Sequence, residues 1–352
     1  MHPLTAPSAE QPARSEKPTP FHRIATLRPA WGRWSKPLVT LAAAFVAYVV
    51  LISVVLVLTI LVLAVVPGVN VAIGVTSGDP TSPLDVTLAL AMGATWIPAG
   101  IIGVRFGGWR PLGTVWSVAA RLRRELRGAY GIWGVAMGAV VVLIAAVAGA
   151  TSGADGAAGS GASLPQLLLV ALVVLVLAPL QAVGIELTLR GAVMQAVGTW
   201  LRSPVLPILA ATAVVLIGRE LTAPVTLPAL ALALAAAVLA WKTGGLELPI
   251  VLTATVMIAS HLVSAVGAGS GAGAGAAALN AAAAAPGTSS AALAATAAEA
   301  GAAALAGGIA AAVALLLATA ATVAWISSRE GIALLEPVGR PAAEPAPEPV
   351  LH

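Results

Sequence analysis

The amino-acid sequence predicts an all-α protein that crosses a membrane about eight times. Of its 352 residues, 59% are hydrophobic and only 9% are charged, and the mean hydropathy is +0.98. A typical soluble domain has about 25% charged residues. Several apolar runs also reach the roughly 18 residues that predict a transmembrane helix. These observations together indicate a polytopic membrane protein.

Eight apolar runs account for the predicted spans. Residues 37–163 hold the first three, residues 164–266 hold the next four, and residues 303–326 form the last. The fourth span is a long helix that delivers Glu186 and Arg190 near its inner end. The predicted spans run over about 38–66, 86–104, 132–150, 164 onward, 204–218, 225–241, 246–266 and 303–326.

Three segments lie outside these spans. Residues 1–36 are polar, basic and proline-rich and lack the apolar core of a signal peptide, which predicts a disordered cytoplasmic tail. Residues 267–302 are rich in Ala, Gly and Ser and are expected to form a flexible outer loop with some helix. Residues 327–352 are rich in Pro, Glu and Ala and are expected to form a second cytoplasmic tail.

The connection between the second and third spans is strongly basic. Residues 111–130 are predicted to form an interfacial helix on the inner leaflet, because apolar and basic side chains alternate along them with helical spacing. An ordinary solvated connector is the alternative. The apolar set is Val115, Trp116, Val118, Leu122 and Leu126, and the basic set is Arg121, Arg123, Arg124 and Arg127.

Charge and aromatic residues predict the topology. Eight crossings place both termini on one side, and 17 of the 18 Lys and Arg residues then fall in cytoplasmic segments, with Arg219 as the exception. Eight of the nine Trp lie near the inner boundary, with Trp96 as the exception. We therefore predict a multi-pass protein of the cell membrane with both termini in the cytoplasm.

The same charges predict the partners. Lys and Arg collected on one side favour contact with the lipid bilayer, and not with nucleic acid. The chain has no cysteine, which excludes disulfides, thiolate metal sites and thiol nucleophiles.

An acid and a base stand four residues apart in the fourth span, where a membrane helix ordinarily has neither. Glu186 and Arg190 share one helix face and are expected to pair. Such a pair is either a working catalytic site or a structural pair that neutralises a buried charge. The structural interpretation is the simpler one.

The residues around this pair carry a resemblance. Gln181 to Gly191, followed by Met194–Ala196 and Trp200–Ser203, resembles the first motif of the CPBP intramembrane protease family. That family includes the type II CAAX prenyl endopeptidases, the lysostaphin-resistance-like proteins and bacteriocin-immunity proteins, and is often labelled Abi. The resemblance covers about 164–266, where the turn at 241–247 also matches. It implies a CPBP-like helical core and the activity of an intramembrane metallo- or glutamic endopeptidase.

This sequence departs from the family's motifs at the residues that would carry catalysis. The family has Glu-Glu-x-x-x-Arg, then Phe-x-x-x-His, then a His with an Asn three or four residues later. Isoleucine cannot take a proton from water, and arginine stays protonated and cannot bind a metal. The substituted positions are Ile185 for the first Glu, Val215 and Arg219 for the Phe and His, Thr253 for the third-motif His, and Val256 and Met257 where the Asn belongs.

No other residues are expected to rebuild the site. His261 lies ~22 Å along its helix from the inner end, toward the outer leaflet, while Glu186 lies toward the inner side. We expect His261 to be a packing residue. Zinc catalysis ordinarily needs three protein ligands, so no metal or cofactor is expected, and zinc belongs only to an active enzyme.

Three functions remain open. The first is a catalytically degenerate pseudoprotease that acts by binding a membrane peptide or a partner helix in the inherited cavity. The second is an active endopeptidase of the CAAX type with a drifted motif. The third is a transporter-like or structural helical bundle, which few midplane polar groups support.

Overall fold

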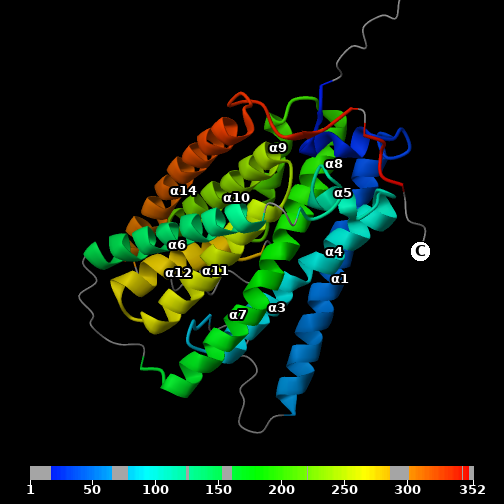
Figure 1. Ribbon diagram of the computed structural model, residues 1–352. Helices are drawn as coiled ribbons and strands as arrows, with labels where there is room; N and C mark the ends of the chain where they lie inside the picture. The colour runs from blue at the N-terminus through cyan, green and yellow to red at the C-terminus, as the bar shows by residue number, and fades with distance from the viewer. Residues whose placement is uncertain are drawn as a thin grey trace, which may run out of the picture.

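The computed structural model describes residues 17–65, 78–123, 127–152, 161–219, 221–285, 301–342 and 344–348, and Figure 1 shows their all-α arrangement. The long helices are α1 (Lys36–Ala64), α6 (Arg127–Thr151), α7 (Leu164–Glu186), α10 (Ala223–Thr243), α11 (Glu247–Val266) and α14 (Gly301–Glu330). The shorter ones are α3 (Pro83–Ala94), α4 (Trp96–Ile102), α5 (Gly113–Trp116), α8 (Gln195–Trp200), α9 (Val205–Ala213) and α12 (Gly271–Ala283). Two π-helical segments, η2 (Gly103–Gly107) and η4 (Leu187–Met194), and two 3-10 turns, η1 (Phe21–Thr26) and η5 (Val214–Leu216), join them.

Within the described residues, seven helical segments are long and apolar enough to cross a membrane. They correspond to seven of the eight predicted spans. The predicted fifth span, 204–218, differs, because its apolar helix covers only Val205–Leu216. At about 1.5 Å per residue it is about 18 Å long, little more than half of a bilayer core. The chain then turns at Gly218, whose φ of 72° favours glycine.

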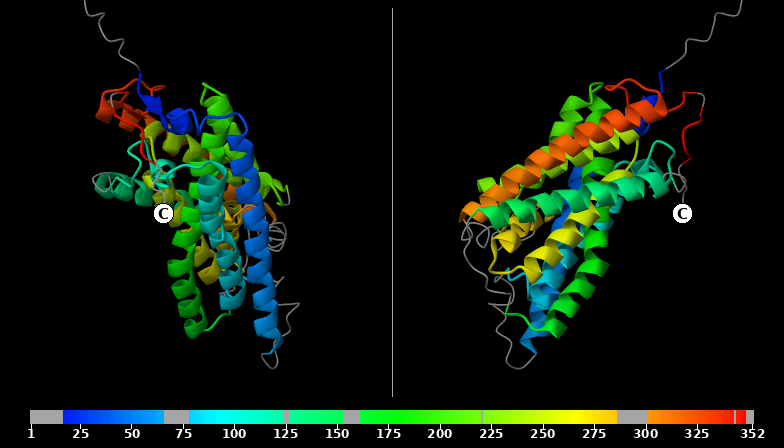
Figure 2. Two further views of the ribbon diagram at one scale, coloured as in Figure 1. Left: turned by 90° about the vertical axis from the view of Figure 1, so that its right-hand side faces the viewer. Right: turned by 60° about the vertical axis from the view of Figure 1, so that its left-hand side comes forward.

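Helix α7 is the centre of the bundle. Figures 1 and 2 show it between two groups, with α1, α3 and α4 on one side and α6, α10, α11, α12 and α14 on the other. Its inward face is a row at intervals of four residues, and every side chain in that row is fully buried. The opposite face stays exposed, as expected of a lipid-facing surface. The buried row is Val170, Val174, Ala178 and Ala182, and the exposed row includes Leu168, Leu172 and Leu175.

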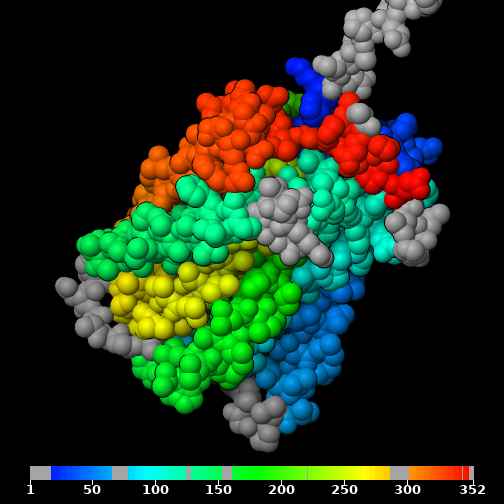
Figure 3. Space-filling model, viewed as in Figure 1, coloured from blue at the N-terminus to red at the C-terminus, as the bar shows by residue number. Residues whose placement is uncertain are grey.

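Residues 271–283 lie in the segment that was expected to be a flexible outer loop, and they instead form the buried helix α12. Helix α12 packs against α6, α11 and α14. Figure 3 shows α6 and α14 side by side on the face of the molecule that is turned toward the viewer. Glycines permit this close packing, as is common between membrane helices. An added Cβ on Gly149 of α6 would overlap the Gly271 carbonyl, and one on Gly307 of α14 would overlap Gly275. Residues 286–300 of that predicted loop lie outside the described residues.

The third span makes a second contact through small residues. Gly134 and Gly138 of α6 both face α11, where Val251 and Thr255 occupy the space that their side chains would fill. The Gly-x-x-x-Gly spacing thus marks a helix contact within the chain.

The expected interfacial helix over 111–130 is not present in its described part. Only Gly113–Trp116 is helical before residue 123, and the chain then joins the turn between α10 and α11. Val118 donates its N–H to the Gly244 carbonyl (2.8 Å), and Leu246 donates to the Trp116 carbonyl (2.9 Å). Arg123 is buried in an ion pair with Glu247 (2.8 Å). A buried carboxylate without a cation is costly. The ion pair between Glu247 and Arg123 therefore holds the basic segment against the protein instead of at the membrane surface.

Both terminal segments are docked in their described parts, although residues 1–36 were expected to form a disordered tail and residues 327–352 a cytoplasmic tail. Strand β1 (Thr19–Pro20) pairs with β2 (Gly339–Arg340), so the described parts of the two terminal segments meet at one end of the bundle. The ammonium of Lys242 donates to the carbonyls of Ala333, Leu334 and Glu336. Residues 1–16 and 349–352 of the predicted tails lie outside the described residues.

The docked N-terminal segment contains a buried histidine. The Nε2–H of His22 donates to the Arg202 carbonyl (3.2 Å), while Nδ1 is buried without a partner. Burial lowers the pKa of His22, and the charge of Arg23 lowers it further. A proton on Nδ1 would add a buried charge with no acceptor.

We predict that Gly149→Ala destabilises the bundle by about 1–3 kcal/mol, because the new methyl group has no room at the crossing of α6 and α12. Gly131→Ala on the same helix is the matched control, since nothing lies within 4 Å of its position. It should be neutral or stabilise by up to about 1 kcal/mol. Thermal unfolding in detergent measures both, and equal effects of the two substitutions would contradict the packing.

We predict that His22 makes stability depend on pH. Its pKa is lower in the folded state than the ordinary value of about 6.5. The unfolded state therefore binds more protons between these two values, and stability falls as the pH drops through about 6.5 toward the lowered pKa of the folded state. In His22→Gln, which can still donate to Arg202, this part of the loss should vanish. Melting temperatures between pH 5 and 8 test it, and superimposable profiles for the two proteins would refute it.

Candidate functional site

The acid and base of the fourth span form a buried ion pair. Glu186 is the last residue of α7, and Arg190 lies one turn later in η4. The Arg190 Nη1 and the Glu186 Oε1 are 3.3 Å apart, and the two side chains are only 2% and 1% exposed. The π-helical geometry of η4 begins directly after Glu186, and such turns are frequent at functional sites.

Two further helices hold this pair. The Thr253 hydroxyl on α11 donates to Glu186 Oε1 (2.7 Å). The Arg190 Nη2 donates to the Ala233 carbonyl on α10 (2.7 Å). Glu186 Oε2 and Arg190 Nε are buried without a protein partner. The Glu186 carboxylate thus connects α7 to α11 through the Thr253 hydroxyl, and to α10 through Arg190 and the Ala233 carbonyl.

The predicted site positions meet at one hollow. Ile185 lies beside Glu186, and Val215, Arg219 and Thr253 reach the same space from the α9–α10 hairpin and from α11. The hollow has a volume of about 20 Å³, which is room for about one water molecule. Its remaining lining comes from α10 and the end of α12: Ala229, Leu232, Ala233, Ala282, Ala283 and Ala284.

Arg219 forms part of the wall of this hollow. Its guanidinium donates to the carbonyls of Ala281 (2.7 Å), Ala282 (3.0 Å) and Ala284. The last carbonyls of a helix have no partner within the helix and carry its partial negative charge, so a cation stabilises them. The topology inferred from sequence placed Arg219 in an outer loop, whereas the short α9 hairpin brings it to the end of α12 inside the protein.

The other predicted positions lie apart from the hollow. Val256 and Met257 are fully buried on α11 but do not line it. His261 is also outside its lining, and its Nδ1–H donates to the Met257 carbonyl (2.7 Å). This local bond matches the expected packing role.

The side chains at the hollow do not fit zinc. Glu186 is the one carboxylate among its lining residues, and its Oε1 is already bound by Thr253 and Arg190. The other charged groups there are two guanidinium ions, which cannot coordinate a metal. Elsewhere in the described part of the chain, no three His, Asp or Glu side chains gather closely enough to hold a metal ion.

Sequence reasoning missed two polar contacts near the site. Arg110, beyond the second predicted span, donates to the Gln195 amide oxygen (2.5 Å), and Gln195 donates to the Thr114 carbonyl. Burial lowers the pKa of Arg110 to about 10, so it stays charged at neutral pH. The other is the Arg123–Glu247 pair. For both contacts, the sequence shows only that a polar residue lies inside or beside an apolar run. That pattern does not predict which residue it will bind.

Comparison with protein-family models, curated proteins and solved structures yields no match to this chain.

We predict that Arg190→Met lowers the stability of the folded protein by about 3–5 kcal/mol, because it leaves a buried carboxylate without its cation. Adding Glu186→Gln should restore part of the loss. The matched control is Arg329→Met, which breaks the exposed pair with Glu330 and should cost less than about 1 kcal/mol. Folded yield and melting temperature are the readouts. Wild-type stability of Arg190→Met, or no rescue by Glu186→Gln, would argue against a structural pair.

Proposed function

We propose that this chain is a catalytically degenerate relative of the CPBP intramembrane proteases that acts by binding a membrane peptide or a partner helix. The observation that carries the proposal is the clustering of the substituted motif positions. Ile185, Arg219 and Thr253 come from three separate parts of the chain and line the hollow that holds Glu186. Positions that matched the family motifs only by chance would not be expected to converge in this way.

The chemistry of these side chains supports loss of hydrolysis. A general base must be able to accept a proton near the working pH, and neither isoleucine nor arginine can. Glu186 is the remaining acid, and its Oε1 already accepts a hydrogen bond from the Thr253 hydroxyl and pairs with Arg190. Its available oxygen faces a space that admits about one water molecule.

The size of the hollow limits where a peptide could bind. A peptide segment is far larger than one water molecule, so it could enter only if Arg219 left the carbonyls at the end of α12. Three hydrogen bonds to a charged group oppose that movement. Binding on an outer helix face therefore requires less rearrangement than binding in the inherited cavity.

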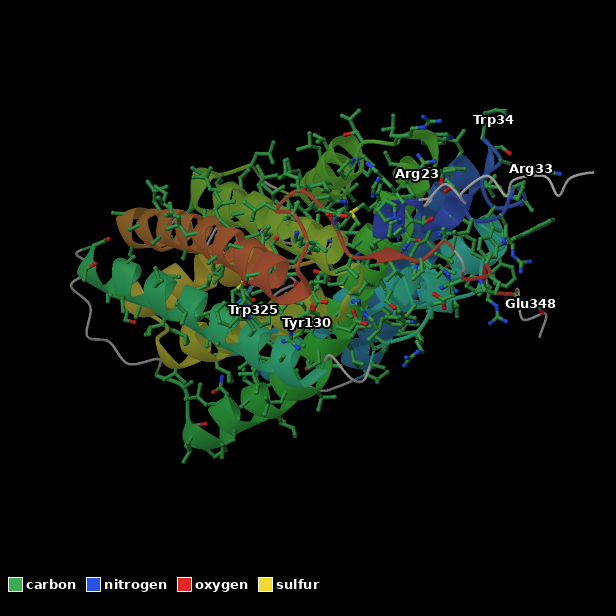
Figure 4. The ribbon with its side chains drawn as sticks, turned by 45° about the horizontal axis from the view of Figure 1, so that its top comes forward. Arg23, Arg33, Trp34, Tyr130, Trp325 and Glu348 are labelled. Carbon is green, nitrogen blue, oxygen red and sulfur yellow. The ribbon has the colours of Figure 1, made fainter. Side chains whose placement is uncertain are left out.

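We also infer a multi-pass protein of the cell membrane with both termini in the cytoplasm. The support is the pairing of β1 with β2 at one end of the bundle. That end also carries Arg23 and Arg33 (Figure 4) and Arg202, whose carbonyl accepts a hydrogen bond from His22, as expected for cytoplasmic segments.

The experiment presents purified protein with a panel of transmembrane and prenylated peptides and measures cleavage and binding separately. We predict no cleavage and saturable binding of at least one peptide. Glu186→Ala should bind that peptide with unchanged affinity if it folds, because the carboxylate contacts only the protein's own groups.

Cleavage that disappears in Glu186→Ala would instead establish the active endopeptidase with a drifted motif. No binding to any peptide of the panel would count against a binding function and in favour of a structural or transporter-like bundle.

A further inference from the structure

Three chain segments meet at the end of the bundle that carries the terminal strands. The Trp200 indole N–H after α7 and η4 donates to the Trp34 carbonyl (3.0 Å). His22 donates to the Arg202 carbonyl (3.2 Å), and η1 packs against α8 so closely that Gly198 has no room for a side chain beside His22. The Lys36 ammonium lies 3.5 Å from the centre of the Trp109 ring. Segments far apart in sequence therefore form one surface.

This surface is basic, and the acids near it come from the C-terminal segment, where the Ala346 carbonyl accepts a hydrogen bond from Arg28 and where Figure 4 shows Glu348 at the same end of the molecule. We name it the basic rim, made of Arg23, Arg33, Lys36 and Arg202 with the rings of Trp34 and Trp109. Residues 17–40, 103–110 and 198–206, which build it, contain no Asp or Glu. The hydrogen bond from His22 to the Arg202 carbonyl brings Arg202 to the sequence neighbour of Arg23, and burial and then the charge of Arg202 lower the pKa of Arg23. An anion between these guanidinium groups would relieve their repulsion.

Apolar groups adjoin the charges. Trp34 and Trp109 are 74% and 64% exposed, and Figure 4 shows Trp34 beside Arg33, with Arg23 at the same end of the molecule. Exposed aliphatic side chains follow directly on both helices that leave the rim: Leu38 and Val39 on α1, and Val205 and Leu206 on α9. Trp rings at this depth lie ordinarily at the level of lipid headgroups.

We propose that the basic rim binds the phosphate headgroup of an anionic phospholipid, whose acyl chains lie along the exposed faces of α1 and α9. The guanidinium groups of Arg33 and Arg202 supply paired donors that match phosphate oxygens. The Trp34 ring covers the glycerol region, and the aliphatic residues one turn further along contact the chains. A free phosphate would use the charges only and would leave these apolar contacts unfilled.

The test measures lipid retention by native mass spectrometry of the full chain, released from nanodiscs that contain equal phosphatidylglycerol and phosphatidylcholine. The rim variant is Arg33→Gln with Arg202→Gln, both exposed residues outside the buried ion pairs. The control is Arg121→Gln with Arg329→Gln, which removes two exposed arginines elsewhere. Melting temperatures show that each variant is folded, and a parallel arm titrates inorganic phosphate against the wild-type protein in neutral detergent.

We expect phosphatidylglycerol to be retained over phosphatidylcholine by the wild-type protein and by the control. The rim variant should lose about 10–30-fold in that preference, at about one kcal/mol for each removed cation. Equal retention of the two lipids, or equal loss in the rim and control variants, would overturn the proposal. Stabilisation by millimolar phosphate that the rim variant loses, without lipid selectivity, would assign the rim to a free anion and would also overturn it.

Discussion

A buried carboxylate organises the centre of this protein. Glu186 lies among apolar helices, where an unpaired charge costs several kcal/mol. Arg190 on the following turn reduces that cost, Thr253 donates a hydrogen bond from α11, and Ala233 on α10 accepts one from Arg190. Three long helices thus take their relative positions around one charge. Apolar helix faces can pack against one another in many arrangements. The ion pair and hydrogen bonds at this centre, by contrast, need particular partner atoms and so fix one arrangement of the helices.

A second cation, Arg219, forms part of the wall of the hollow at this centre. Arg219 reaches inward because α9 is too short to cross the bilayer, and it binds the free carbonyls at the end of α12. These contacts fix α12 against the hollow and leave room for about one water molecule. A catalytic site for peptide hydrolysis needs a base, an activated water and access for a substrate. Under the proposed CPBP assignment, the family residues that would supply the base are replaced here, and access for a substrate would require Arg219 to move. The proposed loss of hydrolysis follows from these two facts.

Much of the fold was readable from the sequence. Hydropathy located seven segments that the structure shows as long apolar helices, and spacing predicted the pair of Glu186 and Arg190. The family motifs selected Ile185, Val215, Arg219 and Thr253, which line one hollow. The CPBP resemblance that selected them stays a prediction.

Other features were out of reach for physical reasons. Lipid and protein interior are equally apolar, so hydropathy does not show which face of a helix is buried. Helix α12 consists almost wholly of Ala and Gly, a composition typical of loops as well as of tight helix crossings. Residues 111–123 have an amphipathic pattern, but the buried Glu247 lies far along the chain and binds Arg123. The docked tails likewise depend on long-range contacts, such as those of Lys242, that local composition does not encode.

Closure of the hollow is the claim on which the functional account depends, and thiol accessibility tests it most directly. The chain has no cysteine, so one introduced thiol reports on one position. Ala229→Cys and Ala283→Cys place it in the lining of the hollow, and Ser203→Cys places it on the exposed surface. With a water-soluble maleimide, the account predicts rapid modification at 203 and very slow modification at 229 and 283. Comparable rates at all three positions would show a hollow open to molecules of substrate size and would contradict the account.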